Sequence, residues 1–353
     1  KICLCENSES FVVFVATWDG KLLSIKYDEK RETIVCQQEI DITKDGSKPV
    51  LAVAELDNIA YVSAEISDEE WAIYKIEFTG DNDFDRKKQS ILVGTHPKPI
   101  NQLVIGEDKR LYSFGYDGVC NVWNLNEIHS FPMKSYKLGK IVTQVQKKDS
   151  HILCVLAGES FALINTEDTQ NEPVYFSARS EHLKSSQITS LAINKFVPDD
   201  SSRDDILDFA LGTVEGRVIH CEYSLAERPG EKLKSQNPKA GGVVYAHQTF
   251  YKDRQISFPV NAIAYHISFD GLLFSGGSEG KIKFHDFPVQ KVYKSLFEDR
   301  MPVSHLLTNS SGEYVVIAKG YGWHHDKNKI FGKNEQEKAK IYIYILEEND
   351  MPS

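Results

Sequence analysis

The feature that most constrains the fold is a short unit that recurs along the chain: an apolar strand, an acidic residue followed by glycine, and a second strand. The acidic residue and glycine predict a tight hairpin, because glycine adopts a positive φ at little cost. Four clear copies end in Gly20, Gly118, Gly216 and Gly280. The first three of these glycines are 98 residues apart, and the last follows after 64. A hairpin repeated at such intervals indicates a repeat architecture of antiparallel strands.

Weaker copies of the unit divide the two long intervals, at Ser67–Trp71 and Ala157–Phe161. Half of each interval is roughly 49 residues, slightly longer than the blade of about 40–45 residues in a WD-type propeller. With a final unit over Lys291–Leu346, seven repeats use the whole length of 353 residues. The sequence therefore predicts an all-β fold, a seven-bladed WD-repeat β-propeller.

Short β-branched or aromatic runs bounded by turn residues predict strands along most of the chain, and no window shows a sustained helical period. The clearest strands are 12–16, 21–27, 72–78, 119–125, 217–223, 281–286 and 340–345. We predict a single domain over 1–353, with blades at 1–29, 30–82, 89–126, 130–168, 172–225, 241–289 and 290–348. The polar stretches 81–88, 198–205, 228–242 and 323–340 are interpreted as loops.

Closure of the ring is a separate question. A ring of blades is usually sealed by an N-terminal strand that completes the last blade. Because this chain enters a strand of the first blade almost immediately, we expect the sealing strand to lie upstream of Lys1. If Lys1–Cys5 is itself that strand, this expectation fails.

Composition excludes several classes of protein. The chain has 41 Lys+Arg and 51 Asp+Glu, a net charge of -10, which argues against a general nucleic-acid binder. No uninterrupted apolar run exceeds six residues, so the sequence predicts no transmembrane helix. The six cysteines include no CxxC pair, so we interpret them as buried, reduced thiols of a cytosolic or nuclear protein rather than as zinc ligands.

Signatures of catalysis are weak. Neither a GxSxG elbow nor a P-loop is present, and Gly276–Ser278 precedes a predicted hairpin instead of the helix that would bind a phosphate. His324–Asp326 lies in a long polar stretch, and adjacent strand side chains point to opposite faces, which disfavours a metal site. We therefore expect no enzymatic activity and no cofactor. A propeller hydrolase remains a remote alternative that would need converging carboxylates or metal ligands.

Several stretches resemble one propeller family. Those that resemble the Bub-type mitotic-checkpoint propeller are Ile91–Ile100 and Gly115–Gly118 of the third blade, Val214–Val218 of the fifth, Phe258–Ile263 and Ser275–Gly280 of the sixth, and Tyr321–Trp323 of the seventh. The resemblance covers most of the chain but is faint in the second and fourth blades. The sister family, the Rae/Gle propeller of messenger-RNA export, shares the fifth- and sixth-blade motifs. The Val-Gly-Thr-His stretch favours the checkpoint family.

The resemblance implies a non-enzymatic adaptor of the spindle assembly checkpoint, found at the kinetochore, in the nucleus and in the cytoplasm. It implies binding to a GLEBS peptide of the Bub checkpoint kinase or its pseudokinase relatives. It also implies binding to phosphorylated MELT repeats of the kinetochore scaffold. A monomeric propeller in a hetero-complex would then be expected, with no direct contact to nucleic acid or membrane. The alternative is an export propeller that binds a nucleoporin GLEBS motif.

The resemblance also assigns candidate binding residues. Trp18 matches a family Trp on the peptide-binding face, although a rim aromatic packed between blades is the plainer interpretation. Tyr116 stands where a second such Trp would be, and it keeps an aromatic platform with a polar tip. Arg217 matches a family Arg that holds acids and phosphate, a task suited to a guanidinium. The alternative for Arg217 is a salt bridge to Glu215 or Glu222.

Two departures from the family reduce the basic residues available to acidic ligands. Ser186–Thr189 stands where the family has Tyr-Gln-x-Arg, so an Arg is replaced by Thr189. Tyr245-Ala246-His247 stands where the family has Phe-Lys/Arg-Cys-His and keeps only the His. We include Tyr245, His247 and Lys252 among the expected peptide- or phosphopeptide-binding residues, with Lys252 and Arg254 as candidates to compensate for the lost charges. Either the ligand has co-adapted or one of the two binding activities is weakened.

Overall fold

The computed structural model describes residues 1–7, 10–43, 48–67, 70–77, 90–126, 131–158, 160–168, 171–177, 186–196, 205–225, 238–296, 300–320 and 339–352. The regular elements in this part of the chain are antiparallel β-strands and one 3₁₀ helix, η3 (Glu348–Asp350). No helix among these residues has the length and apolar character needed to cross a membrane.

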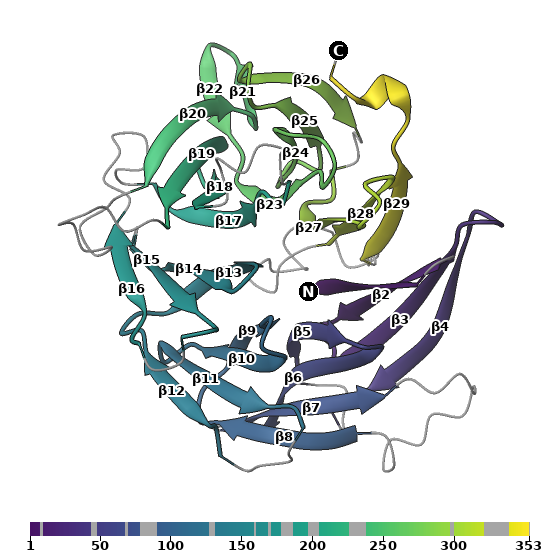
Figure 1. Ribbon diagram of the computed structural model, residues 1–353. Helices are drawn as coiled ribbons and strands as arrows, with labels where there is room; N and C mark the ends of the chain where they lie inside the picture. Colours follow the sequence, from purple (N-terminus) through teal and green to yellow (C-terminus); the bar gives the residue numbers. More distant parts are fainter. Residues whose placement is uncertain are drawn as a thin grey trace. The chain divides into compact units, whose positions relative to one another are not determined.

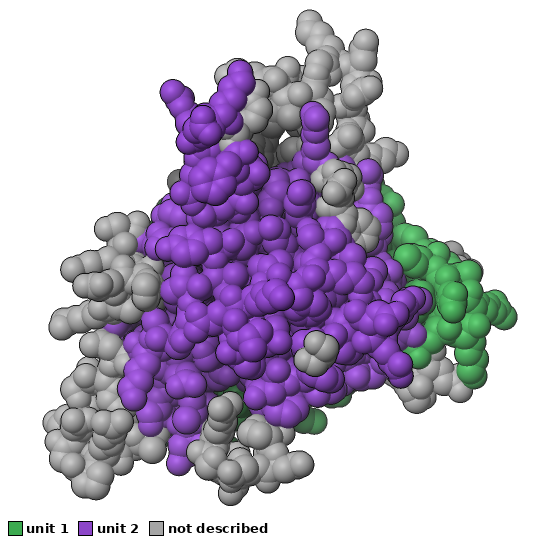
Figure 2. Space-filling view, turned by 90° about the horizontal axis from the view of Figure 1, so that it is seen from above, with its two compact units in different colours: residues 1–157, 162–173 green, residues 158–161, 174–353 purple. Residues whose placement is uncertain are grey.

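The chain divides into two compact units, coloured green and purple in Figure 2. The first contains Lys1–Ala157 and Ala162–Pro173, and the second contains Gly158–Phe161 and Val174–Ser353. The units are described one after the other.

The first unit consists of antiparallel sheets in which strands consecutive in the chain lie side by side (Figure 1). The first sheet is β1 (Ile2–Asn7), β2 (Ser10–Ala16), β3 (Lys21–Asp28) and β4 (Thr33–Asp41). The second is β5 (Val50–Leu56), β6 (Ile59–Ser67), β7 (Glu70–Glu77) and β8 (Ser90–His96). The third is β9 (Ile100–Ile105), β10 (Arg110–Gly115), β11 (Val119–Asn124) and β12 (Lys134–Lys137). The fourth, β13 (Val142–Lys148), β14 (His151–Leu156), β15 (Ser160–Asn165) and β16 (Val174–Ser177), contains the boundary between the units.

The second unit continues the same meander. Its first complete sheet is β17 (Ile188–Ile193), β18 (Ile206–Thr213), β19 (Arg217–Ser224) and β20 (Lys239–Tyr245). A two-stranded hairpin follows, β21 (Gln248–Tyr251) and β22 (Arg254–Ser257). The sixth blade is β23 (Val260–Tyr265), β24 (Leu272–Gly277), β25 (Ile282–Asp286) and β26 (Lys291–Leu296). The seventh is β27 (Val303–Thr308), β28 (Tyr314–Lys319) and β29 (Lys340–Ile345).

The seven successive meander sheets confirm the predicted all-β, seven-bladed propeller arrangement. The clearest predicted strands are all present, within one or two residues of their expected ends. The blade boundaries differ, because the first sheet extends to Asp41 and the second to His96, beyond the expected ends at 29 and 82. The repeat was counted from the hairpin that joins the second and third strands of each sheet. This hairpin carries no sequence signal for the fourth, outer strand. β1 pairs with β2, so Lys1–Cys5 lies in the first sheet. The seventh sheet has three strands in its described part.

The core lies between consecutive sheets. One cluster joins Phe14 and Leu22 of the first sheet to Val62 and Ile76 of the second, and another joins the fifth and sixth sheets. Strands in the middle of a sheet are covered on both faces, which explains the continuous apolar run of β14. Burial of each such large side chain contributes roughly 1.5–3 kcal/mol.

A bulge recurs one residue after the start of the first strand in six sheets, so that this residue has no partner in the register. The six bulged residues are Leu51, Asn101, Thr143, Thr189, Asn261 and Ser304. Three of them donate a side-chain hydrogen bond to the carbonyl of the first residue of another sheet. These bonds are Asn101 Nδ2 to Val142 (2.6 Å), Thr189 Oγ1 to Val260 (2.6 Å) and Asn261 Nδ2 to Val303 (3.1 Å). The bulge therefore links successive blades through polar side chains.

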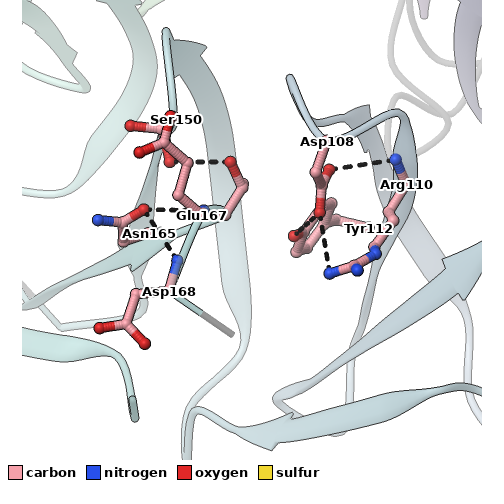
Figure 3. Close-up of polar contacts among 8 residues, drawn as sticks. Asp108, Arg110, Tyr112, Ser150, Asn165, Glu167 and Asp168 are labelled. Atoms are coloured by element: carbon pink, nitrogen blue, oxygen red, sulfur yellow. Dashed lines mark hydrogen bonds and ion pairs between the residues drawn. The ribbon is translucent and has the colours of Figure 1, made fainter. Parts of the chain in front are cut away.

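Acidic and amide side chains close turns in the third and fourth sheets (Figure 3). Asp108 accepts hydrogen bonds from the Arg110 amide (3.1 Å) and the Tyr112 hydroxyl (2.9 Å), and it lies 3.4 Å from Arg110 Nη1. In a separate group, the Asn165 side chain accepts hydrogen bonds from the Glu167 and Asp168 amides (2.9 and 3.4 Å). Such contacts stabilise turns by mimicking a backbone bond.

The thiols are free at all six cysteines. Cys5, Cys120, Cys154 and Cys221 are buried, as expected, and burial raises the pKa of Cys5 to about 12. Cys36 is an exception, because it lies exposed on the outer strand β4. The interpretation of all six as buried was therefore wrong at Cys36, and Cys3 is only half-buried.

Candidate functional site

Four turns between second and third strands share one form: Thr or Gly, a variable residue, an acidic residue and Gly. They span 17–20, 115–118, 213–216 and 277–280. Each final glycine has a positive φ, from 73° to 88°. At Gly20 a Cβ would also meet Thr43 Oγ1 and lie 2.7 Å from the Lys48 carbonyl, so a larger residue does not fit. The turn backbone is thus fixed by its ends, and the variable residue can project from it.

The variable residue is further held by its own amide in three of these turns. The Tyr116 amide donates to the Pro99 carbonyl (2.9 Å), and the Val214 amide to the Gln187 carbonyl (3.0 Å). The Ser278 amide donates to the Pro259 carbonyl (3.0 Å). In each case the acceptor directly precedes the first strand of the same sheet.

Trp18 occupies the variable position of the first sheet. Its side chain is 49 % exposed, although it is one of the largest apolar side chains in the protein. The turn beneath it is closed by Thr17, whose hydroxyl donates to the Lys21 carbonyl and accepts from the Lys21 amide (3.0 Å each). A half-exposed indole on a rigid turn suits an interaction hot spot.

Tyr116 occupies the corresponding position of the third sheet and is 43 % exposed. Asp117 accepts from the Val119 amide (3.1 Å), which closes the turn below it. Partial burial raises the pKa of the Tyr116 phenol, so the hydroxyl is a neutral hydrogen-bonding group near pH 7. Trp18 and Tyr116 belong to the same unit and lie on separate sheets.

Arg217 and Tyr245 are directly opposite each other on β19 and β20, so their side chains share one face of the fifth sheet. Arg217 Nη2 donates to Ser186 Oγ (3.1 Å) and lies 3.6 Å from Glu215 Oε2. The predicted alternative, a salt bridge to Glu215, is therefore present. Tyr245 is 61 % exposed. The pair puts a cationic residue and an exposed aromatic residue on one sheet face, an arrangement that suits a carboxylate or phosphate next to an apolar group.

His247 differs from its expected role in ligand contact, because its side chain is completely buried. Its Nδ1 lies 2.5 Å from Glu279 Oε1 and its Nε2 lies 2.7 Å from Ser275 Oγ. The His247 amide donates to the Gly216 carbonyl (3.0 Å), and its carbonyl accepts from the Phe258 amide (2.8 Å). His247 thus fixes the base of the β21–β22 hairpin next to the turn that precedes Arg217.

Lys252 lies exposed at the tip of this hairpin, in a two-residue turn with Asp253. The hairpin is tied to the fifth sheet by Gln248, whose side-chain amide donates to the Glu215 carbonyl (2.8 Å). Arg217, Tyr245 and the hairpin therefore belong to one region of the second unit. His247 lies beneath it.

Thr189 and Ala246 stand where the resembling family has basic residues, and both have structural surroundings in this chain. Thr189 is a bulged residue bonded to the Val260 carbonyl, and Ala246 is buried. Neither residue supplies a surface charge. Lys252 and Arg254 are exposed on the hairpin instead.

Sequence reasoning missed two buried polar networks. In the third sheet, Ser113 Oγ lies 2.7 Å from His96 Nε2 and accepts a hydrogen bond from Trp123 Nε1 (2.8 Å). Burial lowers the pKa of His96 to about 4. In the sixth sheet, Ser275 Oγ lies between His247 and His285, whose Nε2 is 2.6 Å away. The sequence signal that could have revealed both networks is a serine two residues before the glycine that opens the turn. Ser113 and Ser275 occupy this position, and a histidine lies upstream of each.

The sequence raised two kinds of chemical site, a metal site and a phosphate-binding loop. Among the residues with described positions, no three His, Cys, Asp or Glu side chains are grouped to hold a metal ion. Gly276–Ser278 ends β24 and enters a hairpin, as predicted. His324–Asp326 and Tyr321–Trp323 lie outside the described residues.

Comparison with known proteins finds similarity to an export factor and to a checkpoint protein. No protein-family model matches the chain. It is 24 % identical over 308 residues to the mRNA export factor rae-1 of Caenorhabditis elegans, which covers 86 % of this chain and 74 % of the relative. It is 23 % identical over 335 residues to the spindle assembly checkpoint protein bub3 of Schizosaccharomyces pombe, which covers 94 % of this chain and 88 % of the relative. The chain is a WD-repeat β-propeller homologous to these export and checkpoint proteins.

Proposed function

We propose that the chain is a non-enzymatic peptide-binding adaptor of the spindle assembly checkpoint. It would bind a GLEBS segment of the checkpoint kinase or a relative, and phosphorylated MELT repeats of the kinetochore scaffold. It would act at the kinetochore, in the nucleus and in the cytoplasm, as one propeller within a hetero-complex. The observation that carries the proposal is the pair Arg217 and Tyr245, a cationic residue directly opposite a 61 % exposed aromatic residue on one sheet face.

The Arg217 guanidinium already contacts an acidic and a polar side chain. Its 3.6 Å approach to Glu215 is longer than a hydrogen bond, whereas its contact with Ser186 (3.1 Å) is a normal one. A ligand carboxylate or phosphate that displaces Glu215 would gain a bidentate, charge-assisted contact. In the first unit, Trp18 and Tyr116 offer partly exposed rings that would bind apolar side chains of a peptide.

The checkpoint assignment is supported by the extent of similarity. The checkpoint relative aligns with 94 % of this chain and 88 % of its own length, compared with 86 % and 74 % for the export relative. The identity to the export relative, 24 % against 23 %, supports a second candidate function. In that case the chain would bind a nucleoporin GLEBS motif and would have no need to recognise phosphothreonine.

Titration with three peptides tests the proposal: a GLEBS peptide, a MELT peptide and the same MELT peptide phosphorylated on Thr. We expect the GLEBS and phosphorylated MELT peptides to bind, and the phosphate to strengthen MELT binding at least tenfold. Arg217→Ala should remove most of that gain, a loss of more than about 1.4 kcal/mol. Binding of the GLEBS peptide without any gain from phosphate would favour the export function. If neither peptide binds, both functions are excluded.

A further inference from the structure

Most described side chains of the hairpin β21–β22 are exposed to solvent. Thr249, Phe250 and 252–257 are all exposed, and Phe250 is 75 % exposed. A two-stranded hairpin has no core of its own and is marginally stable unless another element covers it. An aromatic side chain on such an element is well placed to contact a partner.

The backbone of the hairpin leaves an edge for a further strand. Lys252 and Asp253 have φ of 47° and 61°, which defines a two-residue turn with a hydrogen bond between the residues on either side of it. Hydrogen-bonded and non-hydrogen-bonded pairs alternate along an antiparallel ladder, so the next pair, Phe250 and Gln255, directs its amides outward. In the described part of the chain these two strands form a sheet by themselves. The Phe250 amide and carbonyl therefore face the outer edge of β21.

The charge of the hairpin selects an acidic partner. Residues 248–257 contain Lys252, Arg254 and Asp253, a net charge of +1 on a chain of net charge -10. Arg217 lies at the base of the hairpin, because Gln248 bonds to the carbonyl of Glu215. A basic tip on an acidic protein attracts acidic segments. Nucleic acid is disfavoured, because its binding typically needs about 6–10 basic contacts to phosphates.

We propose that an extended, acidic segment of a partner protein adds to the β21 edge as a third strand. Its backbone would pair with the outward amide and carbonyl of Phe250, and an aliphatic side chain would pack on the Phe250 ring. Its carboxylates would approach Lys252 and Arg254. This inference rests on the proposed adaptor function and extends that site from Arg217 and Tyr245 along the hairpin. Strand addition of this kind derives affinity from the backbone and specificity from alternate side chains.

The first test measures binding of a fluorescein-labelled peptide of alternating Glu and Val, with a Lys-for-Glu peptide as its counterpart. We expect the acidic peptide to bind and Phe250→Ala to weaken it at least tenfold. Ile256→Ala is the matched control, because Ile256 lies exposed on the opposite face of the same hairpin and should leave affinity unchanged. Lys252→Glu with Arg254→Glu should abolish binding, whereas Lys291→Glu on the exposed start of β26 should not.

The second test measures amide hydrogen exchange by NMR. Saturating acidic peptide should slow exchange at the Phe250 amide and leave the Gln255 amide, on the other edge, unchanged. Unchanged exchange at Phe250, full affinity of Phe250→Ala, or tighter binding of the Lys peptide or of oligouridylate RNA would overturn the inference. If Arg217→Ala weakens phosphorylated MELT binding while Phe250→Ala has no effect on either peptide, the adaptor function stands and the hairpin inference fails. If the acidic peptide binds through Phe250 and neither GLEBS nor MELT peptides bind, the reverse holds.

Discussion

The third and sixth sheets contain the same buried device, a serine between two nitrogen groups, but they differ in one partner. In the third sheet Ser113 contacts His96 and the indole of Trp123. In the sixth sheet Ser275 contacts His247 and the imidazole of His285. All six side chains are buried.

Because the partners of Ser113 and Ser275 differ, different groups determine which atom donates and which accepts in each network. A serine hydroxyl donates one hydrogen bond and accepts up to two. In the third sheet, Trp123 Nε1 donates to Ser113 Oγ, and the amide nitrogen Asn121 Nδ2, which can only donate, lies 3.0 Å from His96 Nε2 and makes that nitrogen an acceptor. An imidazole can do either, so in the sixth sheet the direction is set by Glu279, which accepts from His247 Nδ1 at 2.5 Å and leaves His247 Nε2 to accept from Ser275. The Glu279 carboxylate thus orients the histidine of the sixth-sheet network, whereas the Asn121 amide orients that of the third.

The strongest test of this comparison removes each serine. Ser113→Ala leaves the Trp123 indole N–H without its partner, whereas His96 Nε2 keeps Asn121 Nδ2 at 3.0 Å. Ser275→Ala removes the partner that the Nε2 atoms of His247 and His285 share. Since each buried polar group left unpaired costs about 1–3 kcal/mol, we expect losses of about 4 kcal/mol for Ser275→Ala and about 2 kcal/mol for Ser113→Ala. Urea unfolding measures both. A neutral Ser275→Ala would show that the sixth-sheet network does not stabilise the fold.

Acid should act on both networks through their histidines. Burial lowers the pKa of His96 to about 4 and, with the nearby charge of His247, that of His285 to about 3, from an ordinary value of 6.5. Below pH 6.5 the unfolded chain takes up protons that the folded chain does not, so stability is full above that pH and falls as the pH decreases. For His96 the loss by about pH 4 is about 3 kcal/mol.

Urea midpoints measured from about pH 7.5 to about pH 4.5 check this dependence. His285→Gln retains an N–H donor for Ser275 and removes the titrating group, so its stability should fall less steeply with acid. An identical slope in this variant would contradict the assignment of part of the acid sensitivity to the sixth sheet.

A smaller difference is expected at the glycines that open the two turns. A Cβ at Gly277 would meet both Glu279 Oε2 and His247 Nδ1, whereas a Cβ at Gly115 would meet Asp117 Oδ1 and lie 3.4 Å from His96 Nδ1. Gly277→Ala should therefore separate the carboxylate from the imidazole, a loss of about 2 kcal/mol of buried hydrogen bonding. Gly115→Ala needs only a shift of Asp117 and should lose less than about 1 kcal/mol. Equal losses would indicate that Glu279 does not orient the sixth-sheet network.

The smallest effect on folding is expected from exchanging the variable residues of the same two turns. Tyr116→Ser gives the third-sheet turn the residue of the sixth, and because Tyr116 is 43 % exposed its unfolding free energy should change by less than about 0.5 kcal/mol. GLEBS peptide affinity should fall about tenfold, or about 1.4 kcal/mol, if the ring contacts the peptide. Calorimetric titration measures the affinity, and Ser278→Tyr is the control for a ring added elsewhere. Loss of stability together with affinity would return Tyr116 to a packing role.

The sequence predicted the strands and hairpins well because their signals are local. The Asp-Gly or Glu-Gly pair fixes a turn, and the flanking alternation fixes the strands. Outer strands such as β4 carry little periodicity, since most of Thr33–Asp41 is exposed, and so the blade boundaries were placed too early.

The site was harder to predict, because the roles of its residues depend on partners distant in the chain. His247 is a scaffold residue through Ser275 and Glu279, 28 and 32 residues away. Thr189 is an interblade link through Val260, 71 residues away. Neither relation has a sequence pattern at short range. Arg217 and Tyr245 were named through family resemblance, and only the strand register places them side by side.

In the four glycine-ended turns, different residues serve the fold and the exposed surface. Their glycine and acidic residues maintain the backbone, whereas the variable position holds Trp18, Tyr116, Val214 or Ser278 on the same turn. Under the proposed adaptor function, a mutation at that position would alter what the protein recognises while the chain still folds. Partners would then be exchanged by single substitutions, and the four positions would serve as a library for engineering new binding specificity.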